Sequence, residues 1–210
     1  MNRPLLLWDF DNTLLRTWLY TKFILTDLAA HLDRSVDDLY RLADKMEERY
    51  SLDGLLQVLG LNDQQRTQYT RTALERTRTN GGAFLFPGVD AVVRACAVRY
   101  EQGLITRGVE SNQRQKFSST PILHTALALR HFVDPNGSKG ELIQATYSDR
   151  VVTVVDDNAN ELLDILARCP QVRCIRMAWP ERNPPPHPDD NREWPVARST
   201  DELLAILLTN

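Results

Sequence analysis

Two aspartates with one residue between them follow a short apolar run near the start of the sequence. Residues 5–8 form the run, and Asp9 and Asp11 come directly after it. An apolar run that ends abruptly in acidic residues is typical of a buried parallel strand. Because ligands in open α/β sheets bind outside the carboxyl ends of the strands, the pair lies where a reaction is expected. The alternative is a solvated turn, since Asp is a common turn former.

Other reactive groups stand at the boundaries of further expected elements. Thr106 ends a short apolar run, Lys139 begins a helical pattern, and Asp156 and Asp157 end the β-branched run 151–155. The carboxyl ends of neighbouring parallel strands lie at one edge of a sheet. The sequence therefore predicts that these groups meet the first acidic pair.

The charges of these groups narrow the chemistry. Two carboxylates about 4 Å apart repel by roughly 1 kcal/mol in water and by about 4 kcal/mol at an effective dielectric of 20. A cluster of Asp9, Asp11 and Asp156 is therefore expected to hold a cation, and oxygen ligands without His or Cys favour Mg²⁺. Together with the ammonium of Lys139 and the hydroxyl of Thr106, the set indicates a site for a phosphoryl group.

The elements that must position these groups alternate along most of the chain. Strands are expected at residues 5–8, 103–105, 151–155 and 172–177, while residues 127–133 fit either a strand or a helix. Helices are expected at residues 91–99, 139–147, 159–167 and 203–208. Such alternation is typical of right-handed βαβ units. The expected fold class is α/β, with a doubly wound, mainly parallel, Rossmann-like sheet.

One long stretch between the first two expected strands carries only helical patterns. Ser35 and Asn62 stand at capping positions before two of its helices. The expected organisation is an α/β core of residues 1–15 and 85–210, with a small all-helical cap of residues 16–84 inserted after the first strand.

The motifs, in this order, resemble those of the haloacid dehalogenase-like (HAD) hydrolase superfamily, in its phosphatase branch with a helical cap of type C1. Residues 9–13, DFDNT, match the first motif, Thr106 the second, Lys139 the third, and the pair at 156–157 the fourth. The helical insertion and residues 86–89, at the return to the core, match as well. The resemblance covers almost the whole chain.

The resemblance implies a role for each acidic residue. Asp9 would be the nucleophile that forms an aspartyl-phosphate. Asp11 would act as general acid and then as general base. Asp9, the main-chain carbonyl of Asp11 and Asp156 would bind Mg²⁺, with Asp157 supporting the metal site.

The resemblance also implies which residues bind the phosphoryl group. Thr106 would hold its oxygens, and Lys139 would tie it to Asp9. Arg107 stands where Asn is more common in the superfamily, so its guanidinium either reaches the substrate or points to solvent. Gly140 stands where Pro is common, and neither departure removes a reacting group.

The expected activity is Mg²⁺-dependent hydrolysis of a small phosphorylated metabolite. The alternatives are a phosphomutase of the same superfamily and, from another class, a non-catalytic phosphate-binding or signalling module. A dehalogenase is disfavoured, because Asp11 and a metal cluster would serve no purpose in that reaction.

Composition limits the partners and the location. The sequence has 210 residues, of which 42% are hydrophobic and 25% charged, and its formal net charge is −3. Mild acidity gives no support for a nucleic-acid partner, and no run reaches the roughly 18 apolar residues of a membrane span. The three cysteines lack metal-ligand spacing and suit a reducing compartment. We therefore expect a cytoplasmic protein without a nucleic-acid or membrane partner, and its oligomeric state stays undetermined.

Three further features have expected roles outside the chemistry. The histidines, including His187, match no ligand spacing and are expected to be structural or exposed. Residues 179–195, rich in Pro, Asp, Asn and Arg, favour a surface loop, although their place after the last strand also fits the rim of a site. Trp18 is expected either in the core or in a pocket wall.

Overall fold

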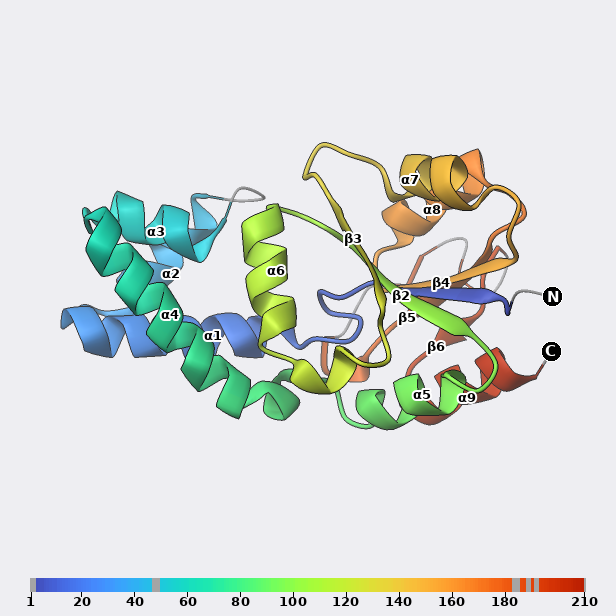
Figure 1. Ribbon diagram of the computed structural model, residues 1–210, viewed down its shortest axis with the longest axis horizontal. Coiled ribbons are helices and arrows are strands. Elements are labelled where there is room, and N and C mark those ends of the chain that lie inside the picture. Colours follow the sequence, from blue (N-terminus) through green and yellow to red (C-terminus); the bar gives the residue numbers. More distant parts are fainter. Residues whose placement is uncertain (1–2, 47–49, 183–185, 188–189, 191–192, 210) are drawn as a thin grey trace.

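A sheet of six parallel strands forms the centre of the computed structural model (Figure 1). The structure describes residues 3–46, 50–182, 186–187, 190 and 193–209. The strands are β1 (Leu5–Trp8), β2 (Glu101–Arg107), β3 (Leu129–Val133), β4 (Val152–Asp156), β5 (Arg173–Met177) and β6 (Val196–Ala197). Their spatial order is β3-β2-β1-β4-β5-β6, which confirms the predicted doubly wound α/β sheet. The two-residue β6 was not predicted.

The direction in which strands are added to the sheet reverses beside β1. β1 pairs with β2 on one side and with β4 on the other. Trp8 lies opposite Val155, and the backbone N–H of Asp9 donates to the carbonyl of Val155 over 2.9 Å. Asp9 and Asp156 therefore leave the sheet side by side at its switch point, where ligands bind in open α/β sheets.

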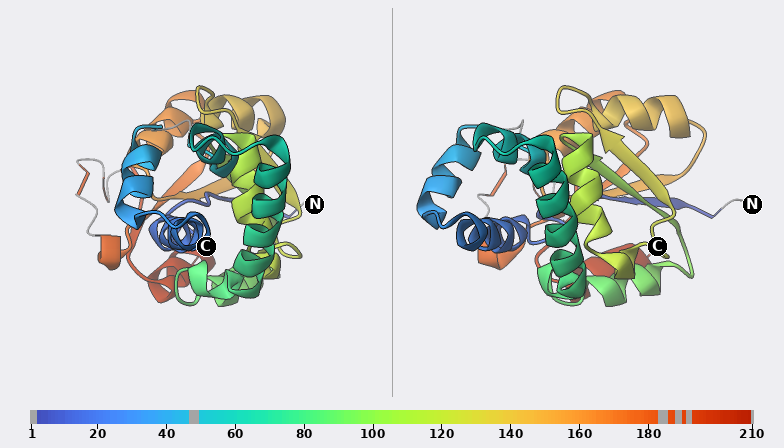
Figure 2. Two further views of the ribbon diagram at one scale, coloured as in Figure 1. Left: turned by 90° about the vertical axis from the view of Figure 1, so that its left-hand side faces the viewer. Right: turned by 60° about the vertical axis from the view of Figure 1, so that its left-hand side comes forward.

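Helices cover both faces of the sheet, as Figures 1 and 2 show. Two pack on one face, α7 (Lys139–Tyr147) and α8 (Ala159–Arg168), and two on the other, α5 (Val89–Cys96) and α9 (Thr200–Leu208). Side chains alternate along β1, so Leu5 and Leu7 join the core beneath α7 and α8. By the same alternation Asp9 shares this face, and for that reason the first residue of α7, Lys139, can reach it.

The described residues between β1 and β2 are mainly helical up to residue 84, and these helices extend beyond one end of the sheet (Figure 1). They are α1 (Thr17–Leu32), α2 (Val36–Asp44), α3 (Leu52–Val58) and α4 (Asp63–Thr79), followed by a short 3₁₀ turn, η2 (Gly81–Phe84). Asn62 and Gln65 form the expected capping box of α4. Ser35 stands at the N-cap of α2, but its side chain makes no capping hydrogen bond.

One of the two expected positions of Trp18, the core, was wrong. Its side chain is 48% exposed, while Tyr20, Ile24 and Leu28 carry the buried face of α1. Trp18 lies in the first turn of the helix, where fewer neighbouring elements are available to cover a bulky side chain.

One helix, α6 (Glu110–Ser118), has no counterpart in the sequence analysis. Its sequence, ESNQRQKFS, is almost entirely polar, so hydrophobic periodicity gave no signal. Gln113, Lys116 and Phe117 are nevertheless buried, because α6 packs between the sheet and α4. Two further 3₁₀ turns are η3 (Pro121–Leu123) and η4 (Pro180–Arg182).

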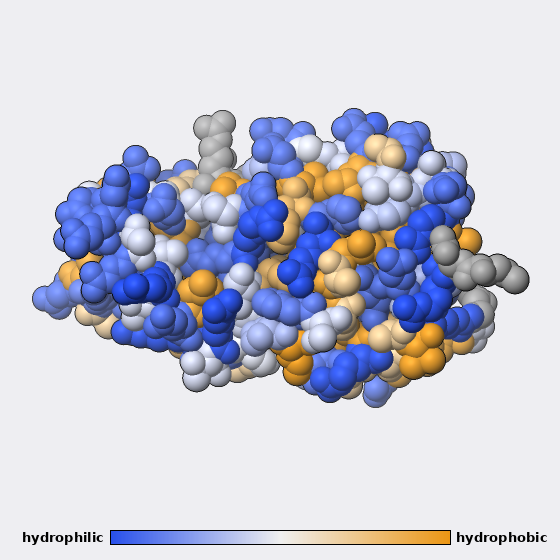
Figure 3. All heavy atoms as spheres, in the orientation of Figure 1, coloured by the Kyte–Doolittle hydropathy of each residue, from blue (hydrophilic) through white to orange (hydrophobic). Residues whose placement is uncertain are grey.

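Polar residues predominate on the face shown in Figure 3, with apolar residues in small groups between them. Within the described ranges, no helix is long and apolar enough to cross a membrane. Cys96, Cys169 and Cys174 are buried thiols outside any disulfide, as expected.

Candidate active site

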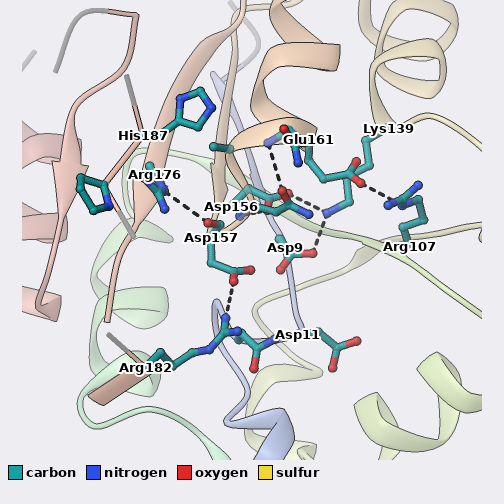
Figure 4. A pocket seen from close by; sticks show the side chains of 15 residues that line it. Asp9, Asp11, Arg107, Lys139, Asp156, Asp157, Glu161, Arg176, Arg182 and His187 are labelled. Atoms are coloured by element: carbon teal, nitrogen blue, oxygen red, sulfur yellow. Dashed lines mark hydrogen bonds and ion pairs between the residues drawn. The ribbon is translucent and has the colours of Figure 1, made fainter. Parts of the chain in front are cut away.

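A cavity of about 550 Å³ opens at the carboxyl edge of β1 and β4 (Figure 4). It brings together most of the residues predicted from the sequence, namely Asp9, Asp11, Arg107, Lys139, Asp156 and Asp157. Thr106 is not among the residues that line it. The cavity has further lining residues that the sequence analysis did not select, among them Glu161, Arg176, Arg182 and His187.

Lys139 bridges two carboxylates at the base of the cavity. Its Nζ lies 2.6 Å from Oδ1 of Asp9 and 2.7 Å from Oδ2 of Asp156. Burial alone would lower the pKa of the Lys139 ammonium, but the two carboxylates outweigh burial and raise the pKa above its ordinary value. The ammonium therefore stays charged. Ser138 fixes its position by capping α7, since the Ser138 hydroxyl accepts from the N–H of Glu141 over 2.9 Å.

Three carboxylates form a cluster beside this lysine. Asp9, Asp156 and Asp157 each offer a ligand oxygen, and these oxygens lie within 4.8 Å of one another. Burial raises the pKa of Asp9 to about 7, with a further contribution from Asp156 and against the opposing effect of Lys139. Burial and the charge of Asp9 raise the pKa of Asp157 to about 6. The cluster thus holds more negative charge than its surroundings stabilise, which is the condition that a divalent cation relieves.

One oxygen of the cluster has no partner in the part of the chain that the structure describes. Oδ2 of Asp9 is buried and makes no hydrogen bond, while Oδ1 of the same carboxylate is held by Lys139. A buried carboxylate oxygen without a donor is costly unless a ligand or cation reaches it. The donor set, oxygens only, fits Mg²⁺.

Asp11 lies apart from this cluster. Its Oδ1 accepts from the hydroxyl of Thr17 over 2.6 Å, and its Oδ2 accepts from Nε2 of Gln113 over 2.7 Å and forms an ion pair with Lys116. Burial alone would raise the pKa of Asp11, but Lys116 and the other donors lower it below its ordinary value. Gln113 and Lys116 both belong to α6, so the sequence analysis missed these two partners of Asp11 together with that helix.

The loop after β1 ties the first motif to the fourth. Asn12 has φ +63°, in the left-handed region that Asn tolerates better than most residues. This turn places the hydroxyl of Thr13 where it accepts from the backbone N–H of Asp157 over 2.9 Å. The indole N–H of Trp179 donates to the carbonyl of Thr13 over 3.0 Å, which holds the loop from the other side.

Thr106 and Arg107 stand at the end of β2. The hydroxyl of Thr106 is buried and lacks a hydrogen-bond partner within the described ranges. Arg107 lines the cavity, where its Nε lies 2.8 Å from Oε1 of Glu161 and its Nη1 donates to the carbonyl of Pro135. The guanidinium of Arg107 is thus held by acceptors at the cavity rather than pointing freely into solvent.

The described part of the segment 179–195 contributes to the rim of the cavity, the less favoured of its two expected positions. Arg182 and His187 line the cavity, although His187 matches no metal-ligand spacing in the sequence. Trp179 stacks on Phe86 with a centroid distance of 4.3 Å, and Trp194 is buried. The polar composition of the segment gave no indication that Trp179 and Trp194 are buried. Two tryptophans in a stretch rich in Pro and Asp could have indicated that part of it packs against the core.

The charged residues of this segment also pair with groups near the cavity. Arg182 forms an ion pair with Asp157 (Figure 4). Arg176 of β5 binds both oxygens of Asp190, over 2.9 and 2.7 Å, and Asp190 accepts in addition from the indole N–H of Trp194.

Comparisons with known proteins give no match in sequence. No family model matches the chain. No curated protein matches it either.

Solved structures, by contrast, match over nearly the whole length. YfnB from Bacillus subtilis, described as a HAD hydrolase bound to magnesium, has a TM-score of 0.65 at 14% identity, covering 99% of this chain and 100% of its own. A haloacid dehalogenase-like hydrolase from Burkholderia xenovorans has a TM-score of 0.69 at 13% identity, covering 97% and 98%. The defluorinating L-2-haloacid dehalogenase Rha0230 has a TM-score of 0.62 at 14% identity, covering 98% and 95%.

The parallel sheet and the helices around it therefore define an α/β fold shared with these solved structures. The fold of this chain is that of the haloacid dehalogenase-like hydrolases, which confirms the fold that the resemblance of the motifs implied.

Proposed function

We propose that this chain is a Mg²⁺-dependent phosphatase that hydrolyses a small phosphorylated metabolite through an aspartyl-phosphate on Asp9. The observation that carries the proposal is the buried bridge of Lys139 between Asp9 and Asp156, which leaves Oδ2 of Asp9 without a partner within the described ranges. A carboxylate held at one oxygen and bare at the other is oriented for nucleophilic attack.

Each step of the reaction can be assigned to residues of this chain. Oδ2 of Asp9 attacks phosphorus, and the bond from phosphorus to the ester oxygen breaks. Asp11, which takes up a proton once it has turned away from Lys116, gives that proton to the departing alkoxide. Asp11 then takes a proton from water, which attacks the same phosphorus and releases phosphate from Asp9. General acid and base assistance of this kind contributes about 10²–10⁴ in rate.

The remaining groups bind and orient the phosphoryl group. Asp9, Asp156 and Asp157, with the main-chain carbonyl of Asp11, would hold Mg²⁺, which when bound neutralises charge on the phosphoryl oxygens. Thr106 would donate its free hydroxyl to one of those oxygens, and Lys139 would hold another. The helical insertion of residues 16–84 would act as a cap that restricts access to small substrates.

Two observations favour a phosphatase over a dehalogenase, the activity named for one of the similar structures. The carboxylate cluster suits a cation, and Asp11 supplies a proton-transfer group within the same loop as the nucleophile. Displacement of halide from carbon by Asp9 would use neither feature.

The test measures phosphate release from sugar phosphates, nucleotides, phosphoglycolate, amino-acid phosphates and p-nitrophenyl phosphate, and halide release from 2-haloacids, with Mg²⁺ and with excess EDTA. We expect phosphate release that needs Mg²⁺ and is lost in Asp9→Asn, while the exposed control Asp149→Asn keeps full activity. Undiminished turnover in EDTA would contradict the metal role, and halide release without phosphatase activity would contradict the proposal. Transfer of the phosphoryl group to a second sugar instead of water would indicate a phosphomutase.

A further inference from the structure

Arg182 forms an ion pair with Asp157, one of the three carboxylates of the candidate metal site. Asp157 contributes one of the three clustered ligand oxygens, yet its Oδ2 is ion-paired with Arg182, and its Oδ1 accepts from the hydroxyl of Thr13 over 3.3 Å. Asp9, by comparison, has one carboxylate oxygen, Oδ2, without a hydrogen-bond partner among the described residues. Figure 4 shows the guanidinium of Arg182 directed at Asp157 along the wall of the cavity.

The balance of charge at the carboxylate cluster disfavours the presence of a divalent cation and the Arg182 guanidinium at the same time. Three carboxylates, Asp9, Asp156 and Asp157, face two cationic side chains in the structure, Lys139 and Arg182. This arrangement leaves one net negative charge. A divalent cation added to it would make the site net positive and would share Asp157 with a guanidinium, at a distance where like charges repel strongly.

Of the two cationic side chains, Arg182 is the one that can leave. The side chain of Lys139 is 3% exposed and is held between two carboxylates. The side chain of Arg182 is 33% exposed and that of its partner Asp157 19% exposed, and Asp157 is the one carboxylate with which Arg182 pairs among the residues that the structure describes. Breaking an ion pair whose cation is this exposed costs less free energy than breaking the buried bridge of Lys139.

We propose that Arg182 and the divalent cation compete for Asp157, so that metal binding releases the Arg182 guanidinium into the cavity, where it binds the anionic group of the substrate. Arg182 already lines the cavity, so release requires only a change of side-chain conformation. A freed guanidinium presents a planar fork of donors that matches phosphate oxygens. Metal and substrate would then bind in order, the first preparing the site for the second. The substrate part of this inference rests on the proposed phosphatase function, whereas the competition for Asp157 does not.

Arg107 provides a matched control. It is the same residue type, lines the same cavity and pairs with a carboxylate, but its partner is Glu161, which lies outside the cluster. Arg107→Gln and Arg182→Gln therefore remove the same charge from the same cavity, and only the second frees a metal ligand.

The first experiment measures Mg²⁺ binding to the metal-free protein by titration calorimetry, without substrate. We expect Arg182→Gln to bind Mg²⁺ about tenfold more tightly than the wild type. Arg107→Gln should change the affinity much less, and Arg182→Lys, which keeps the charge but not the fork, should fall between wild type and Arg182→Gln. Equal Mg²⁺ affinities for Arg182→Gln and Arg107→Gln would overturn the competition.

The second experiment measures binding of inorganic phosphate to the same proteins. With saturating Mg²⁺, the wild type should bind phosphate several-fold more tightly than Arg182→Gln, and without metal the two should be similar. Phosphate affinities that match in the presence of Mg²⁺ would overturn the anion-binding role of Arg182. A protein that shows the effect on Mg²⁺ affinity but hydrolyses no phosphate ester would refute the proposed function and leave the competition standing.

Discussion

Lys116 forms an ion pair with Asp11, from a helix that lies 105 residues further along the chain. The same carboxylate accepts from Thr17 at the start of the insertion and from Gln113 on α6. One side chain thus connects the first motif, the insertion and α6. In its proposed role as general acid, Asp11 would have to turn from these donors toward the substrate.

Replacing Lys116 with Met is expected to destabilise the protein. The lysine side chain is 6% exposed, and its loss leaves the Asp11 carboxylate without its cation. We expect the free energy of unfolding to fall by about 2 kcal/mol, less than for a fully buried pair because Thr17 and Gln113 still donate. Urea unfolding measures the change. Arg94→Met, which removes an exposed pair with Asp90, is the control and should cost roughly 0.3–0.5 kcal/mol. Equal losses in the two variants would show that the pair of Asp11 and Lys116 contributes little.

Replacing Asp11 with Asn is expected to reduce turnover in a way that depends on the leaving group. For alkyl phosphates, whose alkoxide must be protonated, we expect kcat to fall by about 10²–10⁴. For p-nitrophenyl phosphate, whose phenolate leaves readily, the loss should be much smaller. Steady-state kinetics on both substrates make the comparison. The same loss on both would indicate that Asp11 only maintains the structure.

Gly81 and Gly82, at the return from the insertion, allow a matched test of close packing. A Cβ at Gly81 would lie 1.9 Å from the backbone oxygen of Ser119, just after α6, whereas one at Gly82 would meet nothing within 4 Å. Gly81→Ala is expected to lower the free energy of unfolding by about 3 kcal/mol or more, because backbone has to move. Gly82→Ala should change it little. Thermal unfolding of both variants decides the point, and similar Tm values would show that the chain relaxes easily there.

Asp164 on α8 predicts a pH-dependent contribution to stability. It accepts from the Ser138 hydroxyl and from the Gly140 N–H, and pairs with Arg168 over 2.9 Å. Burial alone would raise the pKa of Asp164, but these partners lower it. A carboxyl whose pKa is lower in the folded state stabilises the protein above its unfolded pKa of about 3.9, and this stabilisation is lost as pH falls through the folded pKa.

Asp164→Asn should therefore reduce the free energy of unfolding by about 1 kcal/mol at pH 7. Urea unfolding of variant and wild type across pH should show the difference shrinking as pH falls below about 4. The exposed Asp149→Asn is the control at each pH. A difference that stays constant down to the lowest pH would contradict the electrostatic origin. Because Asp164 holds the first residues of α7, a modest loss of activity from a displaced Lys139 is also expected.

Much of the fold could be predicted from local signals. Apolar runs of four to five residues located β1, β4 and β5, and the polar residues that end them located Asp9, Asp156 and Asp157. Since the side chains of parallel strands end at one edge, the meeting of these carboxylates with Lys139 followed from the order of the elements alone.

The contacts of Asp11 and Asp157 could not be predicted in this way. Lys116 lies on a helix without an apolar stripe, and Arg182 lies in a segment whose composition favours solvent. Both are placed by packing between elements distant in sequence, α6 against α4 and Trp179 against Phe86. The sequence by itself determined which groups can react and the edge of the sheet where they meet. Tertiary structure alone decided that Lys116 holds Asp11 and that Arg182 holds Asp157, because these ion pairs depend on packing between distant elements that no local pattern records.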